Sequence, residues 1–277
     1  MPVINTNTNA QYAQDALKTN AKAMGNVMMQ LATGSRINAA KDDAAGLSLA
    51  QNMTSQVRGL NQAVRNVNDG INLLQTADGA LVETSNMLQR MRELAVQAGN
   101  ATNNAGQRGY LQNEFKSLQD EITRIGDNTG WNNANVFGPG ATTANTLVFQ
   151  AGMNSGQTIS ISLSGMNAAA LSVGTDVASI GTFTGSQAAI STIDNAIETV
   201  NAARSRMGAV MNQLSYSADN MVNISTNIAA SRSTILDTDY ATASAQLAKN
   251  QIIAQAATAM LAQANQQPQS VLSLLKG

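Results

Sequence analysis

The sequence predicts a mainly α-helical protein, in which long antiparallel helices pack as a coiled coil or helical bundle, with a small β-hairpin region in the middle of the chain. Two long heptad repeats, Ala-rich segments at both ends and a Gly-, Asn-, Thr- and Ser-rich middle lead to this prediction. Only 3% of the residues are aromatic, which favours a core of Ala, Leu, Ile, Val and Met over one built on rings.

The first heptad repeat predicts a helix over about residues 43–99. Its apolar residues alternate four and three positions apart from Met53 through Val57, Leu60, Val64, Val67 and Ile71 to Leu74. Leu81 and Leu88 continue one row of this register, and Asp78, Ser85 and Arg92 interrupt the other. A period of about 3.5 residues held this long is typical of a coiled-coil seam. Asp42 and Asp43 offer an N-cap and negative charge for the first turn, and Gly99 with Asn100 ends the helix.

Two further helices are expected. A second heptad repeat predicts a helix over about 187–235, with seam residues Ile190, Ile193, Ile197, Val200, Met207, Met211, Leu214, Ala218, Met221, Ile228 and Ile235. A shorter helix over about 107–125 follows the first long helix. Because the connection between them is short, the shorter helix is expected to fold back antiparallel, which makes the middle of the protein a three-helix bundle in outline.

The segment 131–185 is expected to hold a β-hairpin. Leu147–Phe149 is one candidate strand, and the strict alternation of Thr158–Ser164 is typical of a half-buried second strand. Gly152–Gly156 between them supplies turn residues. Residues 165–185 are expected to be a loop or a further weak strand.

The two ends of the chain resemble one another in composition. Residues 10–33 and 240–266 are both Ala-rich, sparsely charged and apolar at helical spacing. Neither is expected to be a stable helix alone in water. We therefore expect both ends to pack against other helices, in their own chain or in a neighbouring subunit.

Composition argues against catalysis. The chain has no His and no Cys, which removes the commonest general base, the commonest metal ligands and any thiolate nucleophile. Helix capping or helix boundaries explain the paired carboxylates at 42–43 and 237–239. No catalytic residue, cofactor site or metal site is therefore expected.

The charge and hydropathy patterns argue against a nucleic-acid-binding protein, a membrane-spanning protein and a protein with a cleaved secretory signal. A net charge of −1 gives no case for binding nucleic acid. No apolar run approaches the about 18 residues that a membrane-spanning helix needs, so no membrane insertion is expected. The N-terminal segment lacks the features of a cleaved secretory signal. The charged residues of 90–93 are most simply interpreted as a solvated helix face.

Several sequence motifs, in the same order along the chain, resemble those of bacterial flagellin. They cover about residues 1–136 and 186–277, and they are Val3–Asn7, Arg36–Gly46, Asn68–Ile71, Leu88–Gln97, Asp239–Thr242, Leu261–Gln266 and Val271–Leu275. The resemblance implies an inner terminal coiled-coil domain formed by 1–40 plus 236–277, and a rod domain formed by 41–235. Only about 50 residues separate the two similar halves, so no large variable outer domain is expected.

The same resemblance implies a structural role. Flagellin-like chains polymerise helically into the filament that drives swimming, and they leave the cell unfolded through the flagellar type III apparatus to become part of the extracellular flagellum. Partners implied in this way are other copies of the chain, an export chaperone at the C-terminal segment, and the hook-junction and cap proteins. The implied self-assembly residues are Val3, Ile4, Leu17, Val27, Leu31, Arg36, Asp42, Asp43, Leu247, Ile252, Leu261, Val271, Leu272, Leu274 and Leu275.

The resemblance also implies that the vertebrate Toll-like flagellin receptor recognises the monomer. The matching face here consists of Gln89, Arg90, Glu93, Leu94, Gln97 and Glu114. The same face is expected to be buried between protofilaments in the filament.

Three other kinds of protein share some of these features. A flagellar junction or hook-associated protein shares the terminal coiled coil but forms a short collar. An enzyme displayed on the filament is disfavoured by the short middle segment and the absence of His. A free coiled-coil adaptor would differ in whether both termini are disordered in the isolated chain.

Overall fold

The computed structural model describes residues 6–138, 144–175 and 177–276, and from residue 267 onward the backbone alone. The chain divides into two compact units. The terminal unit comprises Met1–Val57 and Thr226–Gly277, and the central unit comprises Arg58–Ser225. The mainly helical fold expected from the sequence is confirmed, whereas the assignment of 1–40 plus 236–277 and 41–235 to separate domains stays a prediction.

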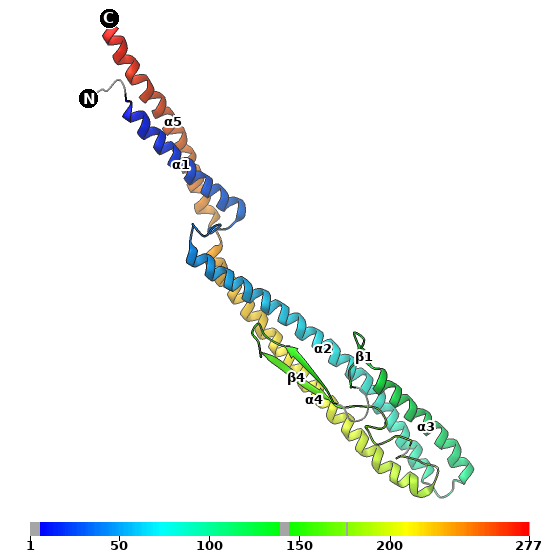
Figure 1. Ribbon diagram of the computed structural model, residues 1–277. Coiled ribbons are helices and arrows are strands. Elements are labelled where there is room, and N and C mark those ends of the chain that lie inside the picture. The colour runs from blue at the N-terminus through cyan, green and yellow to red at the C-terminus, as the bar shows by residue number, and fades with distance from the viewer. Residues whose placement is uncertain (1–5, 139–143, 176, 277) are drawn as a thin grey trace. The chain divides into compact units, whose positions relative to one another are not determined.

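The terminal unit is built on the pairing of helix α1 (Thr8–Thr33) with helix α5 (Tyr240–Lys276), which lie side by side in Figure 1. Asn7 caps the start of α1 by accepting a hydrogen bond from the Ala10 amide. Gly34 ends α1 in a left-handed conformation with φ of 69°, which glycine adopts without strain. Both terminal segments are therefore helical, as their apolar spacing predicts.

Two long helices run through both units, α2 (Ala44–Ala98) and α4 (Phe183–Leu236). Their bounds lie close to the expected 43–99 and 187–235. Within the central unit they are joined by ion pairs, Arg204 Nε with Asp78 Oδ1 at 2.8 Å and Arg92 Nε with Asp194 Oδ1 at 2.6 Å. Asp43 accepts a hydrogen bond from the Gly46 amide at 2.8 Å, which confirms the expected N-cap of α2.

The seam of α2 agrees with the prediction in one row of residues and differs in the other. Leu60, Val67, Leu74, Leu81 and Leu88 are buried as expected. The second row was predicted wrongly: Val57, Val64 and Ile71 are only half-buried, and the buried positions are Ala63, Gly70 and Ala77. Small residues let neighbouring elements approach the helix closely, so in this second row the buried residues are not the largest ones.

Helix α4 shows the same shift. Its buried residues include Ile193, Val200, Met207, Leu214 and Met221 from the predicted seam. Ala189, Ala196 and Ala203 are also buried, whereas Ile190 and Ile197 are half-buried. The core between the long helices thus alternates large and small side chains.

The shorter helix α3 (Ala105–Asn128) begins with a capping box between Asn104 and Gln107. Phe115 and Ile122 bury its apolar face. Figure 1 shows α3 beside α2 in the central unit. Its bounds lie close to the expected 107–125.

The hairpin expected in the middle of the chain is confirmed. Strand β3 (Asn145–Gln150) pairs antiparallel with β4 (Thr158–Leu163), and Phe149 lies opposite Ile159. A second pair of two-residue strands, β1 (Gly130–Trp131) and β2 (Ala134–Asn135), was not predicted. It turns through Asn132 and Asn133, both with positive φ, which asparagine tolerates better than most residues.

The segment after β4 is a loop, but it is a loop that forms core. Met166, Leu171, Val173 and Ile180 are buried. The buried side chain of Gln119 on α3 donates from Nε2 to the carbonyls of Val173, at 2.6 Å, and Ala178, at 3.0 Å. One helix side chain therefore satisfies two buried main-chain acceptors and fixes the loop against α3.

Within the described ranges, no helix combines the length and the hydropathy that crossing a bilayer requires.

Candidate assembly surfaces

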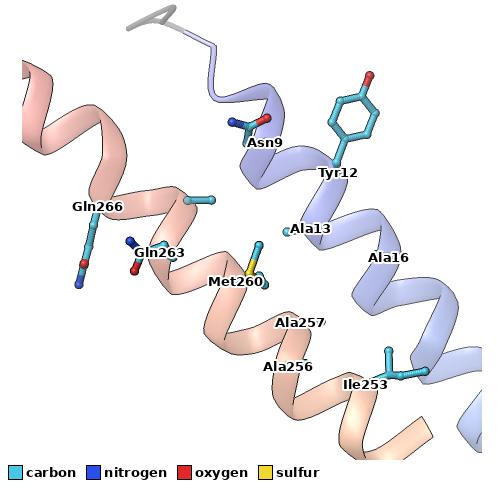
Figure 2. A pocket seen from close by; sticks show the side chains of 11 residues that line it. Asn9, Tyr12, Ala13, Ala16, Ile253, Ala256, Ala257, Met260, Gln263 and Gln266 are labelled. Carbon is cyan, nitrogen blue, oxygen red and sulfur yellow. The ribbon is translucent and has the colours of Figure 1, made fainter. Parts of the chain in front are cut away.

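The pairing of α1 with α5 leaves an apolar groove of about 870 Å³ between the two helices. Figure 2 shows its two walls, and its lining residues are Asn9, Tyr12, Ala13, Ala16, Ile253, Ala256, Ala257, Met260, Gln263, Ala264 and Gln266. None of these residues is charged. A groove with small apolar walls is suited to another apolar, uncharged surface.

Large apolar side chains of the same two helices are exposed. Tyr12 is 75% exposed and Met260 is 65% exposed, and Met28, Met29 and Ile252 are exposed as well. Exposed apolar patches of this kind are typical of surfaces that associate with other molecules.

The connection from α1 to α2 and the connection from α4 to α5 are hydrogen-bonded to each other. Ser35 and Asp237 form an isolated antiparallel bridge. The Arg36 amide donates to the Leu236 carbonyl at 2.6 Å, and the Thr238 amide donates to the Gly34 carbonyl at 2.9 Å. The Arg36 guanidinium adds a bond from Nη2 to the Ile235 carbonyl at 2.9 Å.

The start of α5 is capped by Asp239. Its Oδ1 accepts hydrogen bonds from the amides of Ala241, at 2.9 Å, and Thr242, at 3.2 Å, and its Oδ2 accepts from the Thr242 hydroxyl at 2.8 Å. The bonds from Thr242, followed by that from Ala241, hold the pKa of Asp239 below its ordinary value.

The expected self-assembly residues occupy different environments. Val27 is buried between the terminal helices, and Leu17, Leu31, Leu247 and Leu261 are half-buried. Ile252, Arg36 and Asp42 are exposed, and Asp43 is half-buried at its cap. Val3, Ile4 and the side chains of Val271, Leu272, Leu274 and Leu275 lie outside the described residues.

A second candidate surface lies in the central unit, on α2 and α3. Arg90 joins the two helices, since its Nε donates to Glu114 Oε1 at 2.9 Å and its Nη1 donates to Glu93 Oε2 at 2.9 Å. The bond to Glu93, followed by the bond to Glu114, raises the pKa of Arg90. Gln89 and Gln97 are exposed on the same helix. We call Gln89, Arg90, Glu93, Gln97 and Glu114 the Arg90 face.

Leu94 is placed differently from the other residues expected on this face. Its side chain is completely buried, so it packs into the core beneath the Arg90 face and presents no surface to a partner.

Among the described residues, no three His, Cys, Asp or Glu side chains gather as a metal site would require.

Comparison with known families decides what kind of protein carries these surfaces. Residues 4–143 match the bacterial flagellin N-terminal helical region, and residues 190–275 match the bacterial flagellin C-terminal helical region. The chain belongs to the bacterial flagellin family. Flagellins are structural subunits of the extracellular flagellar filament used for motility, so this chain is a structural protein and not an enzyme.

Individual flagellins match along their whole length. A flagellin of Halalkalibacterium halodurans is 42% identical over 274 residues, which cover 99% of this chain and 100% of the relative. A flagellin of Bacillus subtilis is 39% identical over 302 residues, covering 99% of both chains. The chain therefore corresponds to a short flagellin without a large middle domain, as the sequence predicts.

A solved structure described as a flagellar hook-associated protein from Vibrio parahaemolyticus also resembles this flagellin. The TM-score is 0.58 at 16% identity, covering 71% of this chain and 100% of that chain. At this identity the likeness shows a shared fold alone.

Sequence reasoning missed three features of these units. The groove between α1 and α5 is walled largely by alanines, which carry no strong hydrophobic signal. The pairing of the two connections depends on main-chain bonds, which no side-chain pattern reports. The buried asparagines Asn20 and Asn250 could have been found as polar residues at apolar positions of the helical repeat.

Proposed function

We propose that this flagellin polymerises through the outer faces of α1 and α5, over about residues 3–33 and 240–275. The observation that supports this proposal is the number of exposed apolar side chains on these two helices, Tyr12, Met28, Met29, Ile252 and Met260. Two of them, Tyr12 and Met260, line the uncharged groove. Covering these side chains with neighbouring copies removes apolar surface from water, at about 25 cal/mol per Å² buried. A contact between unlike surfaces of successive copies generates a helical filament when the rotation from copy to copy does not close into a ring.

Seeded growth of filaments tests this proposal. Ile252→Asp and Met260→Asp each place a carboxylate on the proposed surface, at side chains that are exposed in the single chain. Because an unpaired charge is costly to bury, growth from seeds should slow at least about tenfold, as measured by light scattering and negative-stain electron microscopy.

Val148→Asp is the matched control. Val148 is an exposed apolar side chain of β3 in the central unit, and its substitution should leave growth unchanged. Normal filaments from both helix variants would contradict the proposed surface. Short collars instead of long filaments from the unmodified chain would favour the junction-protein alternative.

We propose further that the chain leaves the cell unfolded through the flagellar type III apparatus, with an export chaperone on its C-terminal segment. The absence of cysteine supports this route, because no disulfide has to be reduced before passage. The hook-junction and cap proteins are the proposed neighbours at the two ends of the filament. Cells that lack the apparatus should retain the chain; continued secretion by them would contradict the route.

The Arg90 face is the proposed binding surface for the vertebrate Toll-like flagellin receptor, and also a contact between protofilaments. An exposed Arg whose side chain is held in place by two carboxylates supports this proposal, because arginine is enriched where protein surfaces bind partners. Leu94 supports the face from the core, and Leu94 itself makes no contact in this proposal.

Charge reversal tests the receptor proposal. Arg90→Glu breaks both ion pairs and places three carboxylates together, so binding of purified monomer to the receptor should weaken at least about tenfold. Arg206→Glu is the control. It makes the same charge change at an exposed position of α4, and this variant should bind like the parent. Equal binding by the parent and Arg90→Glu would exclude the face.

A further inference from the structure

Helix α5 contains a proline inside its bounds, at position 268. A proline nitrogen carries no hydrogen, so residue 268 cannot donate the helical bond to the carbonyl four residues earlier, which belongs to Ala264. Every other residue from 240 to 272 is followed, four positions later, by a residue that has an amide hydrogen. The sequence therefore leaves the Ala264 carbonyl of this helix without its usual donor.

A side chain from α1 donates to this carbonyl. The Asn7 Nδ2 lies 2.8 Å from the Ala264 carbonyl oxygen. Both residues are half-buried, and Ala264 lines the apolar groove between the two helices. Asn7 thus supplies, from the other helix, a donor that α5 itself lacks at position 268.

The orientation of the Asn7 amide is fixed by a second bond. Asn7 is the N-cap of α1, and its Oδ1 accepts from the Ala10 amide at 3.0 Å. Reversing the amide would place a donor against the Ala10 amide and an acceptor against the Ala264 carbonyl. Both bonds therefore hold the same orientation, and one side chain caps the first turn of α1 and attaches that turn to α5.

We propose that Pro268 creates a docking site for one hydrogen-bond donor on α5, at the Ala264 carbonyl. Asn7 is the positioning residue that occupies this site and holds the first turn of α1 against α5. A carbonyl without a donor is costly where two helices pack, so a bond to it stabilises the contact more than a bond to a carbonyl already paired within its helix. The contact lies within one chain, so the proposal holds whichever surfaces join the copies.

Introduced cysteines can report the docking, because the chain has none of its own. Asn9 and Gln263 line opposite walls of the groove and form the near pair, since they lie close in sequence to Asn7 and Ala264 (Figure 2). Ala16 and Ala256, each seven residues from its counterpart, form the remote pair. Each pair is treated with a short thiol-reactive cross-linker in the full-length chain, in solution and after polymerisation. Links within one chain are identified by peptide mapping.

The variant Asn7→Ser separates docking from capping. Serine caps a helix about as well as asparagine, but its single hydroxyl cannot both cap Ala10 and reach α5 as the longer amide does. Both pairs should link in the parent sequence. In Asn7→Ser, linkage of the near pair relative to the remote pair should fall about fivefold. Continued linkage of the remote pair separates lost docking from lost pairing of the helices.

The variant Pro268→Ala tests whether the proline is the cause. Alanine at 268 restores the amide hydrogen that bonds the Ala264 carbonyl within α5. Adding Asn7→Ser to this variant should therefore change the ratio by less than about twofold. Asn26→Ser is the matched control, since it makes the same change at an exposed asparagine of α1, and it should keep the parent ratio.

An Asn7→Ser variant that keeps the parent ratio would overturn the proposal. An equal fall in the ratio with proline and with alanine at 268 would overturn it as well, because the effect of Asn7 would then not depend on the missing amide. A similar fall in Asn26→Ser, or a parent that links the near pair in neither state, would also contradict it.

Discussion

At the scale of single residues, helix caps explain two of the charged positions near the connections. Asp43 begins α2 and Asp239 begins α5, each through bonds to main-chain amides. A carboxylate at a helix N-terminus satisfies amides that lack helical partners and interacts favourably with the helix dipole. The carboxylates near 42–43 and 237–239 therefore have structural roles, as the sequence indicated.

The Asp239 cap makes the start of α5 sensitive to pH. Because its folded pKa lies below the ordinary value, the cap stabilises the folded helix above the ordinary Asp pKa and is lost as the pH falls through the folded pKa. Carboxyl NMR titration should give Asp239 a pKa below that of an unstructured Asp. Asp239→Asn keeps a capping side chain without a titrating group and should remove this part of the pH dependence; an ordinary pKa in the parent would contradict the cap.

Single residues also mark the limit of sequence reasoning. Asp43 was predictable because N-caps have a local signature. Gln119 was not, because its hydrogen-bond partners Val173 and Ala178 lie far along the chain and nothing local indicates that a polar side chain is buried. Leu94 lies outside both rows of the predicted seam, so the repeat did not indicate its burial, and the resemblance placed it on an exposed face.

At the scale of elements, glycines of α2 determine how closely the β3–β4 hairpin approaches. A Cβ at Gly70 would lie 2.8 Å from Phe149 Cδ1, and one at Gly59 would lie 3.2 Å from Met153 Cβ. These glycines are three helical turns apart, so they lie on one face of α2. The hairpin can therefore pack closely on this face of α2 because Gly59 and Gly70 have no side chains there.

Alanine substitution distinguishes this packing role from ordinary helix propensity. Gly79→Ala, with no atom within 4 Å of the added Cβ, should stabilise the protein by about 0.5–1 kcal/mol in urea unfolding. Gly70→Ala gains the same propensity but forces the Phe149 ring to move, which costs about 1–3 kcal/mol. The Gly70 variant should therefore be less stable than the Gly79 variant by at least about 1 kcal/mol. Equal stabilisation would show that the hairpin does not rest on Gly70.

The same elements explain the error in the predicted seam. The heptad period located α2 and α4, since a sustained period is a long-range property of the sequence. The choice of the second row followed the largest apolar residues, Val57, Val64 and Ile71, whereas the structure buries Ala63, Gly70 and Ala77. Which row lies inside depends on what packs there, and a hairpin contributed by distant residues is invisible in the repeat itself.

At the scale of the whole molecule, the order of helices and hairpin was predictable and the pairing of the ends was only partly so. The similar composition of 10–33 and 240–266 indicated that both ends pack against helices. Composition could not predict that the two ends pair with each other, as α1 does with α5, because alanine-rich faces fit many partners. Their pairing in one chain and their proposed contacts between copies use different faces of the same two helices.

The pairing of α1 with α5 has a consequence for the order of folding. The hydrogen bonds that join these helices link residues 230 and 257 positions apart. Closing so long a loop in an unfolded chain costs roughly 5 kcal/mol of chain entropy. Once α2 and α4 have paired and the connections at Ser35 and Asp237 have met, almost none of that loop remains to be closed. The two terminal helices can therefore pair at a small cost in chain entropy only after the residues between them have folded. A chain in which α1 and α5 are paired is thus one in which the central part has already folded.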